Sequence, residues 1–319
     1  MQKYFTQKYY ADKRQDTSVK NKALLALAWV SIFWGTTWLA SKEAIRDVPA
    51  LQIIAIRQLV AAVLYIGFFI YKKHSWPKGK QWIAILVMSF LTFMLSNGLS
   101  TWGVKFIPSG LGAIMGAIFP LWLVIIIMIK GKRIPRQALI GLLMGFGGVC
   151  IIFYEHLKDF LNPDFVFGIT LSLCATISWA FSTLYTKQQA INFNPYFSLG
   201  FQMFFSGVII LFIAQISGNT VSLSEIPLSS WWAIAYLVVI GSILTFVAYI
   251  YALQHLPTAL ASIYAYINPI VAVLLGAALL NEKLTVFIAI GGAVTIAGVY
   301  LVNNSFRKKI SPLSSEEGT

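Results

Sequence analysis

Charged residues are scarce in this sequence. Asp, Glu, Lys and Arg make up 11% of its 319 residues, whereas a soluble domain usually contains about 25%. Hydrophobic residues account for 58%. This composition excludes an ordinary soluble domain and predicts a protein of the lipid bilayer. The net charge of +13 does not predict nucleic-acid binding, because most Lys and Arg residues lie in short segments that flank apolar runs.

The residues that build most catalytic and metal sites are also few. Both cysteines, Cys150 and Cys174, fall inside apolar runs, so no disulfide or zinc pattern arises. The sequence contains no HExxH motif, no paired carboxylates in mid-span and no Ser/His arrangement, so we expect no enzyme activity, cofactor or metal site. Carboxylates and histidines occur only near the ends of apolar runs, which argues against a buried proton carrier without excluding one: Glu155, His156, Asp159, His255 and Glu282.

Long apolar runs are abundant. Runs of about 18 to 23 residues bounded by charges or turn-forming residues predict transmembrane helices. Ten such runs occur, at residues 23–41, 51–71, 82–103, 109–129, 137–154, 166–186, 196–216, 231–252, 258–280 and 285–303. The sequence therefore predicts an all-α polytopic membrane protein with ten transmembrane helices.

The distribution of positive charge predicts the orientation. Lys and Arg collect on the cytoplasmic side of membrane proteins. With the N-terminus inside, 18 of the 24 Lys and Arg residues are cytoplasmic, five are outside, and Arg57 lies within a span. Both termini are therefore predicted to be cytoplasmic: a basic segment at residues 1–22 and a tail at residues 304–319.

The two halves of the chain repeat each other, residues 23–154 matching residues 166–303. Two prolines are 12 residues apart in the region of the fourth span and again in that of the ninth: Pro108/Pro120 and Pro257/Pro269. A Trp and a Lys are eight residues apart in the first and sixth spans: Trp34/Lys42 and Trp179/Lys187. Two glycines are seven residues apart in the fifth and tenth spans: Gly141/Gly148 and Gly291/Gly298. Because each half has an odd number of spans, we expect inverted five-helix repeats. The glycines predict close helix packing, within the chain or across a dimer.

Several motifs resemble those of a known family. They are Tyr251-Ala252-Leu253, Leu256-Pro257, Ala261-Ser262, Asn268-Pro269-Ile270, Asn281-Glu282-Lys283-Leu284, Gly291-Gly292-Ala293 and Ala297-Gly298-Val299, with Phe33-Trp34-Gly35-Thr36-Thr37-Trp38 and Ile56-Arg57-Gln58-Leu59. The chain resembles the EamA-like branch of the drug/metabolite transporter (DMT) superfamily. The resemblance implies a carrier, often of amino acids moved outward, with a cavity between spans 1, 3, 4, 6, 8 and 9. The first half departs from the pattern, with Lys132-Arg133 where the second half has Glu282.

Polar residues at helical spacing predict a wet cavity. In spans 1, 3, 6, 8 and 9 they recur on one face, and polar groups in a bilayer should face protein or water. The residues that we expect to line the cavity are Trp34, Thr37, Trp38, Asn97, Trp179, Tyr249, Tyr264 and Asn268. The alternative for any single Ser or Thr is that it bonds to its own helix or holds two helices together.

Two prolines predict mid-span kinks. Pro120 and Pro269 each remove a helical hydrogen bond, which leaves the carbonyls of Gly116 and Ala265 without their usual donors. Such broken helices are typical of transporter binding sites and can act as hinges. A static kink that only shapes packing is the alternative.

Arg57 is the charge within a span. It lies in the outer third of span 2, and Glu43 lies at the outer end of span 1. Either the two form a structural ion pair, or Arg57 reaches the interface, or Arg57 binds a carboxylate of the solute.

The expected partners are a small solute and the bilayer of the cell inner (plasma) membrane, without nucleic acid. A single cation in the spans disfavours phosphorylated solutes, so we expect neutral or zwitterionic metabolites, such as amino acids, moved outward by alternating access. An uncoupled facilitator or exchanger of other metabolites or drugs is the alternative. An intramembrane enzyme or a scaffold is disfavoured. The sequence leaves open whether the protein is a monomer or a homodimer.

Overall fold

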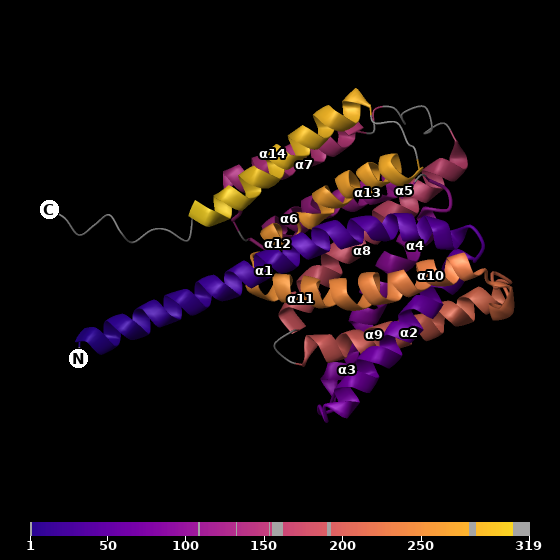
Figure 1. Ribbon diagram of the computed structural model, residues 1–319, viewed down its shortest axis with the longest axis horizontal. Coiled ribbons are helices and arrows are strands. Elements are labelled where there is room, and N and C mark those ends of the chain that lie inside the picture. The colour runs from indigo at the N-terminus through magenta and orange to yellow at the C-terminus, as the bar shows by residue number, and fades with distance from the viewer. Residues whose placement is uncertain are drawn as a thin grey trace.

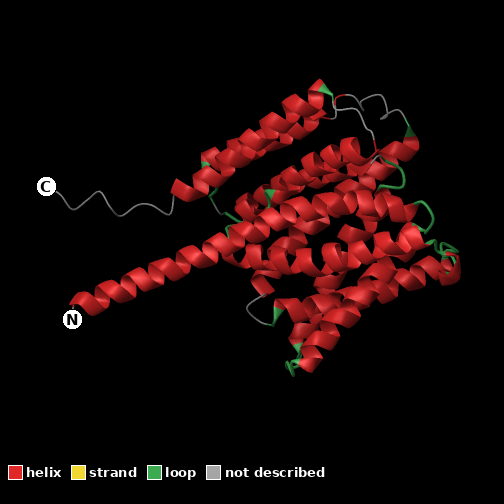
Figure 2. Cartoon of the chain, in the orientation of Figure 1, coloured by secondary structure: helices red, strands yellow, loops and turns green. Residues whose placement is uncertain are grey.

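The computed structural model of the chain describes residues 2–107, 109–131, 133–152, 154, 162–189, 193–280 and 285–308. Within these ranges the secondary structure is helical, and the helices lie side by side in one bundle (Figures 1 and 2). Pro108, Lys132, Glu282 and residues 309–319 of the predicted tail lie outside the described residues.

The helices follow one another in two series. The first comprises α1 (Gln2–Ile45), α2 (Ala50–Tyr71), α3 (Lys80–Met88), η1 (Ser89–Gly98), α4 (Leu99–Gly103), α5 (Ser109–Ala117), α6 (Phe119–Ile129) and α7 (Arg136–Ile152). The second comprises α8 (Pro163–Gln189), α9 (Pro195–Ile216), η3 (Leu223–Glu225), α10 (Leu228–Tyr236), η4 (Leu237–Leu244), α11 (Thr245–His255), α12 (Thr258–Ala261), α13 (Tyr264–Leu280) and α14 (Val286–Lys308).

Each predicted span coincides with helix. Among the described residues, seven helical runs are long and apolar enough to cross a membrane. The remaining three predicted spans, 109–129, 137–154 and 285–303, coincide with shorter apolar stretches at Met115–Ile129, Arg136–Ile151 and Ala289–Val302. The chain is therefore an all-helical, multi-pass membrane protein. Several helices extend past their predicted limits, and the longest extensions are those of α1 at its N-terminus and of α14 at its C-terminus.

The two series share irregularities at corresponding places. The third span of each half is one continuous helix with a π-helical segment in the middle, η1 in the first half and η4 in the second. The fourth span of each half is broken, between α5 and α6 and between α12 and α13. A π-helical segment is rare and often marks a functional site. Its occurrence in both halves indicates that the repeat extends to local backbone geometry.

Equivalent helices of the two halves pack in opposite directions. A Cβ at Gly141 of α7 would lie 2.6 Å from the carbonyl oxygen of Gly298 in α14, and one at Gly148 would lie 2.5 Å from that of Gly291. Residue numbers thus rise along α7 as they fall along α14, so the helices are antiparallel (Figure 1). The two glycine faces that the sequence predicted for close packing contact each other within the chain.

The second and seventh spans pair in the same way. Gly200 of α9 lies against Tyr65 and Ile66 of α2, and Gly207 lies against Leu59. These helices are therefore antiparallel too. The N-terminus of α9 is capped by Asn194, whose side chain accepts hydrogen bonds from the backbone N–H groups of Tyr196 (3.0 Å) and Phe197 (3.1 Å).

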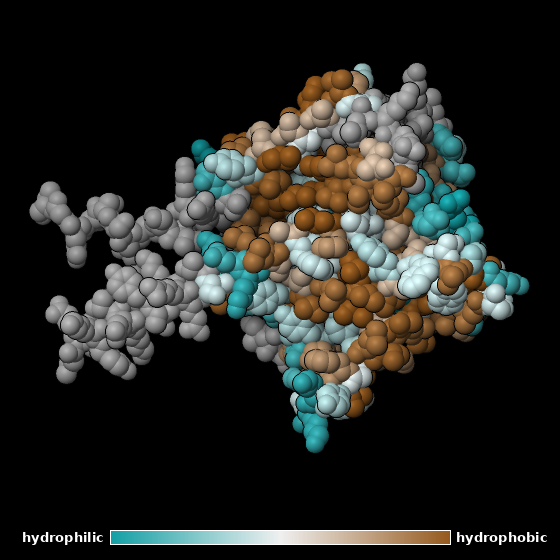
Figure 3. All heavy atoms as spheres, viewed as in Figure 1, coloured by the Kyte–Doolittle hydropathy of each residue, from teal (hydrophilic) through white to brown (hydrophobic). Residues whose placement is uncertain are grey.

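Large hydrophobic side chains point outward from the bundle. Phe68, Phe212 and Tyr300 are 55%, 62% and 67% exposed. On the face drawn in Figure 3, hydrophobic residues cover the middle of the bundle and hydrophilic residues gather near its ends. Such a surface suits lipid, since the backbone polar groups of the helices are satisfied internally.

Candidate functional site

A cavity lies inside the bundle, between helices of both halves. Its volume is about 160 Å³. The first half contributes α1, α2, η1, α4, α5 and α6, and the second contributes α8, α11 and α13. These are the spans that the family resemblance implies, with α2 in addition. The described lining residues are Trp34, Thr37, Trp38, Ser41, Arg57, Ser96, Asn97, Ser100, Thr101, Gly112, Ala113, Gly116, Phe119, Ser172, Ala175, Thr176, Trp179, Phe246, Tyr264, Ala265 and Asn268.

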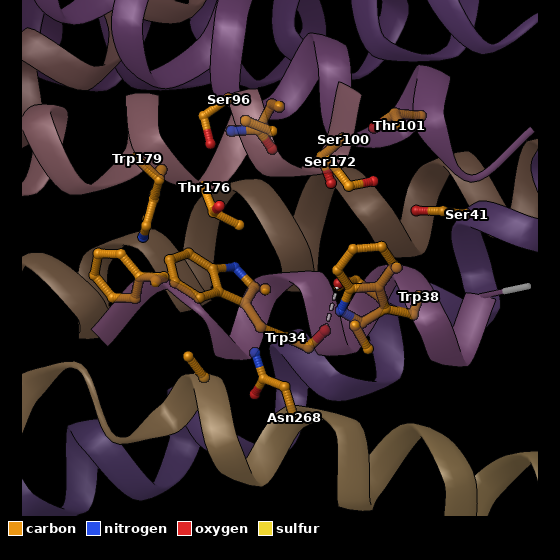
Figure 4. Close-up of a pocket in the computed structure, with 18 of the residues that line it drawn as sticks. Trp34, Trp38, Ser41, Ser96, Ser100, Thr101, Ser172, Thr176, Trp179 and Asn268 are labelled. Atoms are coloured by element: carbon orange, nitrogen blue, oxygen red, sulfur yellow. Dashed lines mark hydrogen bonds between the residues drawn. The ribbon is translucent and has the colours of Figure 1, made fainter. Parts of the chain in front are cut away.

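One end of the cavity is aromatic. Trp34 and Trp179 lie at this end, while Ser41 and Thr101 lie at the other (Figure 4). Ser41 is close to the C-terminal end of α1 at Ile45, and Thr101 is close to the end of α4 at Gly103. The cavity therefore extends from the middle of the bundle toward the end at which α1 and α4 finish.

We call six packed rings at this end the aromatic cluster: Trp34, Phe119, Trp179, Phe246, Tyr249 and Tyr264. The ring centroid of Trp34 is 5.1 Å from those of Phe246, Tyr249 and Tyr264, and 5.6 Å from that of Trp179. Most of these pairs are edge-to-face, a favourable arrangement of aromatic quadrupoles. The cluster joins α1, α6, α8, α11 and α13.

Hydrogen bonds fix the orientation of these rings. The indole N–H of Trp34 donates to the carbonyl oxygen of Gly241 (3.1 Å), and that of Trp179 donates to the hydroxyl of Tyr264 (2.6 Å). The hydroxyl groups of Tyr249 and Thr183 lie 2.7 Å apart. Because buried N–H and O–H groups without partners are costly, these bonds specify one arrangement of the cluster.

Helices beyond the aromatic cluster are tied together on the side away from Ser41. Thr92 of η1 and Ser182 of α8 share a hydrogen bond between their hydroxyls. Near the end of α8, the ammonium of Lys187 donates to the carbonyl oxygen of Leu256, 2.7 Å away, just before α12. These contacts hold η1 to α8, and α8 to the segment before α12, on this side of the aromatic cluster.

The two π-helical segments accept side-chain hydrogen bonds at three consecutive carbonyls each. In η1, Ser178, Asn97 and Gln58 donate to the carbonyl oxygens of Leu91 (2.8 Å), Thr92 (2.9 Å) and Phe93 (3.3 Å).

In η4 the acceptors are the carbonyl oxygens of Gly241, Ser242 and Ile243. The first is bound by Trp34, and the hydroxyl of Tyr65 lies 3.3 Å from the second and 2.9 Å from the third. Partners from α1, α2 and α8 therefore satisfy backbone groups that lipid could not.

Arg57 links these two segments. Its Nε donates to Oγ of Ser242 in η4 (2.8 Å), and one terminal nitrogen donates to Oδ1 of Asn97 in η1 (3.3 Å). Glu43 has another partner, since its carboxylate pairs with Arg46 at 3.1 Å in an exposed position. Among the described residues the Arg57–Glu43 pair is thus replaced by two separate contacts. The reason is that Arg57 lies inside the bundle, whereas Glu43 is at the end of α1.

Seven of the eight predicted cavity residues line the same cavity; Tyr249 is the exception. It is 4% exposed and packs behind the rings of Trp34 and Trp179. Asn268 is 7% exposed. With its amide nitrogen oriented toward the carbonyl oxygens of Ser31 (2.7 Å) and Tyr264 (3.0 Å), it joins α1 to α13.

The prolines occupy different positions in the two broken spans. In the first half the break is at Ile118, and Pro120 lies at the start of α6. In the second half the break falls at Ser262 and Ile263, and Pro269 lies inside α13. Gly116 and Ala265, which the prolines were predicted to affect, both line the cavity.

Some lining residues carry no signal in the sequence. Phe119, Ala175 and Phe246 are apolar residues in apolar spans, and the helical period does not distinguish a cavity face from a packing face. Ser41, Ser96 and Thr176, by contrast, are among the polar residues that recur at helical spacing in spans 1, 3 and 6. Within the described part of the chain, His, Cys, Asp and Glu form no group of three that could hold a metal ion.

A multi-pass bundle of two similar halves around a central cavity is the architecture of a solute carrier. Comparison with known proteins identifies the family of carriers. The sequence profile of the EamA-like transporter family matches residues 21–154 and again residues 166–304, so the chain belongs to this family. It is therefore a membrane transporter of the DMT type and not an enzyme.

Named relatives cover most of the chain. An Escherichia coli K12 protein, the uncharacterized inner membrane transporter YedA, is 29% identical over 87% of this chain and 89% of its own length. The uncharacterized transporter YvbV of Bacillus subtilis is 27% identical over 89% and 92%. A solved crystal structure of a protein shares the fold, with a TM-score of 0.75, 17% identity, and coverage of 91% of this chain and 99% of that one.

Proposed function

We propose that the protein carries small neutral or zwitterionic metabolites, such as amino acids, across the cell inner membrane, and that it works as an exporter. The observation that carries this proposal is the cavity between the two halves, lined by tryptophans, hydroxyl groups and a single charged residue. Aromatic faces suit apolar parts of a solute, and hydroxyl groups suit its polar parts. The outward direction rests on the family resemblance alone.

The volume of the cavity favours metabolites over drugs. Pockets for drug-sized ligands usually measure about 300–1,000 Å³, whereas this cavity measures about 160 Å³. A small solute fits such a space without displacing the surrounding helices.

The proposed mechanism is alternating access between two inverted five-helix repeats, residues 23–154 and 166–303. The antiparallel packing of α2 with α9 and of α7 with α14 supports inverted repeats. With both termini cytoplasmic, as the charge distribution predicts, the cavity would extend outward from the aromatic cluster. The contacts of Lys187 and Ser182 would then hold helices together on the cytoplasmic side of the cavity.

Transport by purified protein in proteoliposomes tests the proposal. We expect uptake of at least one radiolabelled amino acid above that of empty liposomes, saturable with concentration. Uptake equal to that of empty liposomes for every amino acid and related metabolite in the panel would contradict it.

Uncoupled facilitation or exchange is a second candidate. The described lining residues include no Asp, Glu or His that could carry a proton. Uptake measured with and without an imposed pH gradient distinguishes uncoupled transport from proton-coupled transport, since a proton-coupled carrier concentrates the solute only when the gradient is present.

A further inference from the structure

Arg57 is the charged residue among the described residues that line the cavity. Its hydrogen-bond partners, Ser242 and Asn97, are both neutral. The ion pair that the described residues do form joins Glu43 to Arg46 at the surface. A guanidinium inside a membrane bundle without a counter-ion is costly, and charges at such places usually pair or serve a function.

The guanidinium group is held in place and still has donors to offer. A guanidinium carries five N–H donors, and the bonds to Ser242 and Asn97 use two of its nitrogens. Asn97 is itself anchored, because its Nδ2 donates to the carbonyl oxygen of Thr92 at 2.9 Å. Since Ser242 and Asn97 come from η4 and η1, the group is positioned by both halves of the protein. A preorganised donor of this kind binds an anion with little loss of side-chain entropy.

The surroundings of Arg57 limit the anion to one carboxylate. A phosphate group would carry more negative charge than one guanidinium balances, and the described lining holds no second cation. Toward the middle of the bundle the lining includes the five rings of the aromatic cluster that face the cavity, which suit an apolar or cationic portion of the same solute: Trp34, Phe119, Trp179, Phe246 and Tyr264.

We propose that the transported solute carries a single carboxylate, which binds the guanidinium of Arg57, while the remainder of the solute lies against the aromatic cluster. This inference rests on the proposed transport function and deepens it. It selects zwitterionic and monoanionic carboxylates over neutral solutes. It also gives a role to the contacts of Arg57 with η1 and η4. Through them, the residue that binds the carboxylate would contact both halves of the protein.

Matched solutes and matched variants test this assignment. Wild-type protein and the variants Arg57→Gln, Arg57→Lys and Arg46→Gln are purified, reconstituted into proteoliposomes and checked for a monodisperse elution profile. Uptake is measured for glycine, serine, leucine and phenylalanine, for their primary amides, and for the corresponding 2-hydroxy acids. The amides lack the carboxylate, and the hydroxy acids lack the ammonium group. Arg46→Gln is the control, since it removes one exposed positive charge that pairs with Glu43.

We expect the wild-type protein to prefer acids to amides. In Arg57→Gln the KM for acids should rise on the order of 10- to 100-fold, the range of a charge-assisted hydrogen bond, while the KM for amides changes by less than about threefold. Arg57→Lys should retain part of the preference, and Arg46→Gln all of it. Uptake of the hydroxy acids comparable to that of the amino acids would assign the site to monocarboxylates in general, whereas uptake of the amino acids alone would assign it to zwitterions.

Failure of the carboxylate site and failure of the transport function give different results. If the wild-type protein transports acids and amides equally, or if Arg57→Gln keeps the preference for acids, the carboxylate site is wrong and the transport function stands. Equal loss of acid and amide uptake in Arg57→Gln would assign Arg57 a structural role. If the wild-type protein transports none of these solutes, the proposed function fails and this inference falls with it.

Discussion

Trp179 shows how single side chains determine the shape of the cavity. Its ring packs against Trp34, and its indole N–H donates to the hydroxyl of Tyr264, 2.6 Å away. Tyr264 is 4% exposed, so water cannot readily replace this donor. One hydrogen bond thus holds α8 against α13 where the cavity meets the aromatic cluster.

Replacing Trp179 by Phe keeps an aromatic ring and removes the donor. Leaving a buried acceptor without its partner costs about 1–3 kcal/mol of stability, so we expect a lower thermal midpoint in detergent. Because Trp179 and Tyr264 line the cavity, we also expect the KM to rise. The control is Trp232→Phe, because Trp232 is 70% exposed on α10. Equal midpoints and equal KM values for the two variants would show that the bond to Tyr264 is dispensable.

At the scale of elements, the packing of α7 against α14 depends on glycine. The backbones approach so closely that a Cβ at Gly148 would lie 2.5 Å from the carbonyl oxygen of Gly291. Small residues at helix interfaces allow such approach within a membrane. A Cβ at the neighbouring Gly147, in contrast, would meet no atom of the described residues within 4 Å.

The two adjacent glycines therefore make a matched pair. Gly148→Ala forces the helices apart, and overpacking of this kind typically costs about 1–3 kcal/mol. We expect its thermal midpoint to fall by several degrees, while Gly147→Ala is neutral or slightly stabilising, since Ala is the better helix former. Thermal unfolding in detergent, followed by circular dichroism, measures both. Equal midpoints would contradict the close approach of α7 and α14.

Pro269 lies inside α13, next to the cavity-lining Asn268. A proline there denies the carbonyl of Ala265 its helical donor, and alanine would restore that bond and stiffen the helix. If α13 moves as a hinge, Pro269→Ala lowers the maximal transport rate several-fold at an unchanged protein level. Pro163→Ala, at the first position of α8, is the control because proline is tolerated there. If Pro269→Ala transports at the wild-type rate, the hinge is contradicted, and Pro269 produces only a static kink.

At the scale of the whole molecule, orientation can be tested from two exposed loops. Lys78 lies between α2 and α3, and Ser224 lies between α9 and α10. The distribution of positive charge predicts that the first is cytoplasmic and the second external. Single-cysteine variants are made at each position in a background in which Cys150 and Cys174 are replaced by alanine.

A membrane-impermeant thiol reagent added to intact cells should label Ser224→Cys and leave Lys78→Cys unlabelled until the cells are lysed. Both native cysteines lie in helices within apolar segments, so the cysteine-free background should retain its transport activity. Labelling of Lys78→Cys in intact cells would reverse the proposed orientation, and with it the side to which the cavity extends.

The sequence by itself determined the helices, the repeat and the family. Apolar runs must form helices in a bilayer because no water is present to bond their backbone groups, so each predicted span coincides with helix. The spacing of Gly141/Gly148 and Gly291/Gly298 identified two faces that do pack together. Polar and aromatic residues at helical spacing identified seven residues that line one cavity.

The tertiary structure alone decided how these parts meet. The π-helical segments η1 and η4 leave no trace in composition, and the side chains that bond to their carbonyls, such as Ser178 and Tyr65, come from other helices. The partner of Arg57 could not be deduced either. Glu43, at the outer end of the first span, was the carboxylate considered as its partner, but Ser242, 185 residues away in the sequence, is brought to the guanidinium by the packing of η4 against α2. Distances through space between distant segments are set by packing, which hydropathy patterns do not encode.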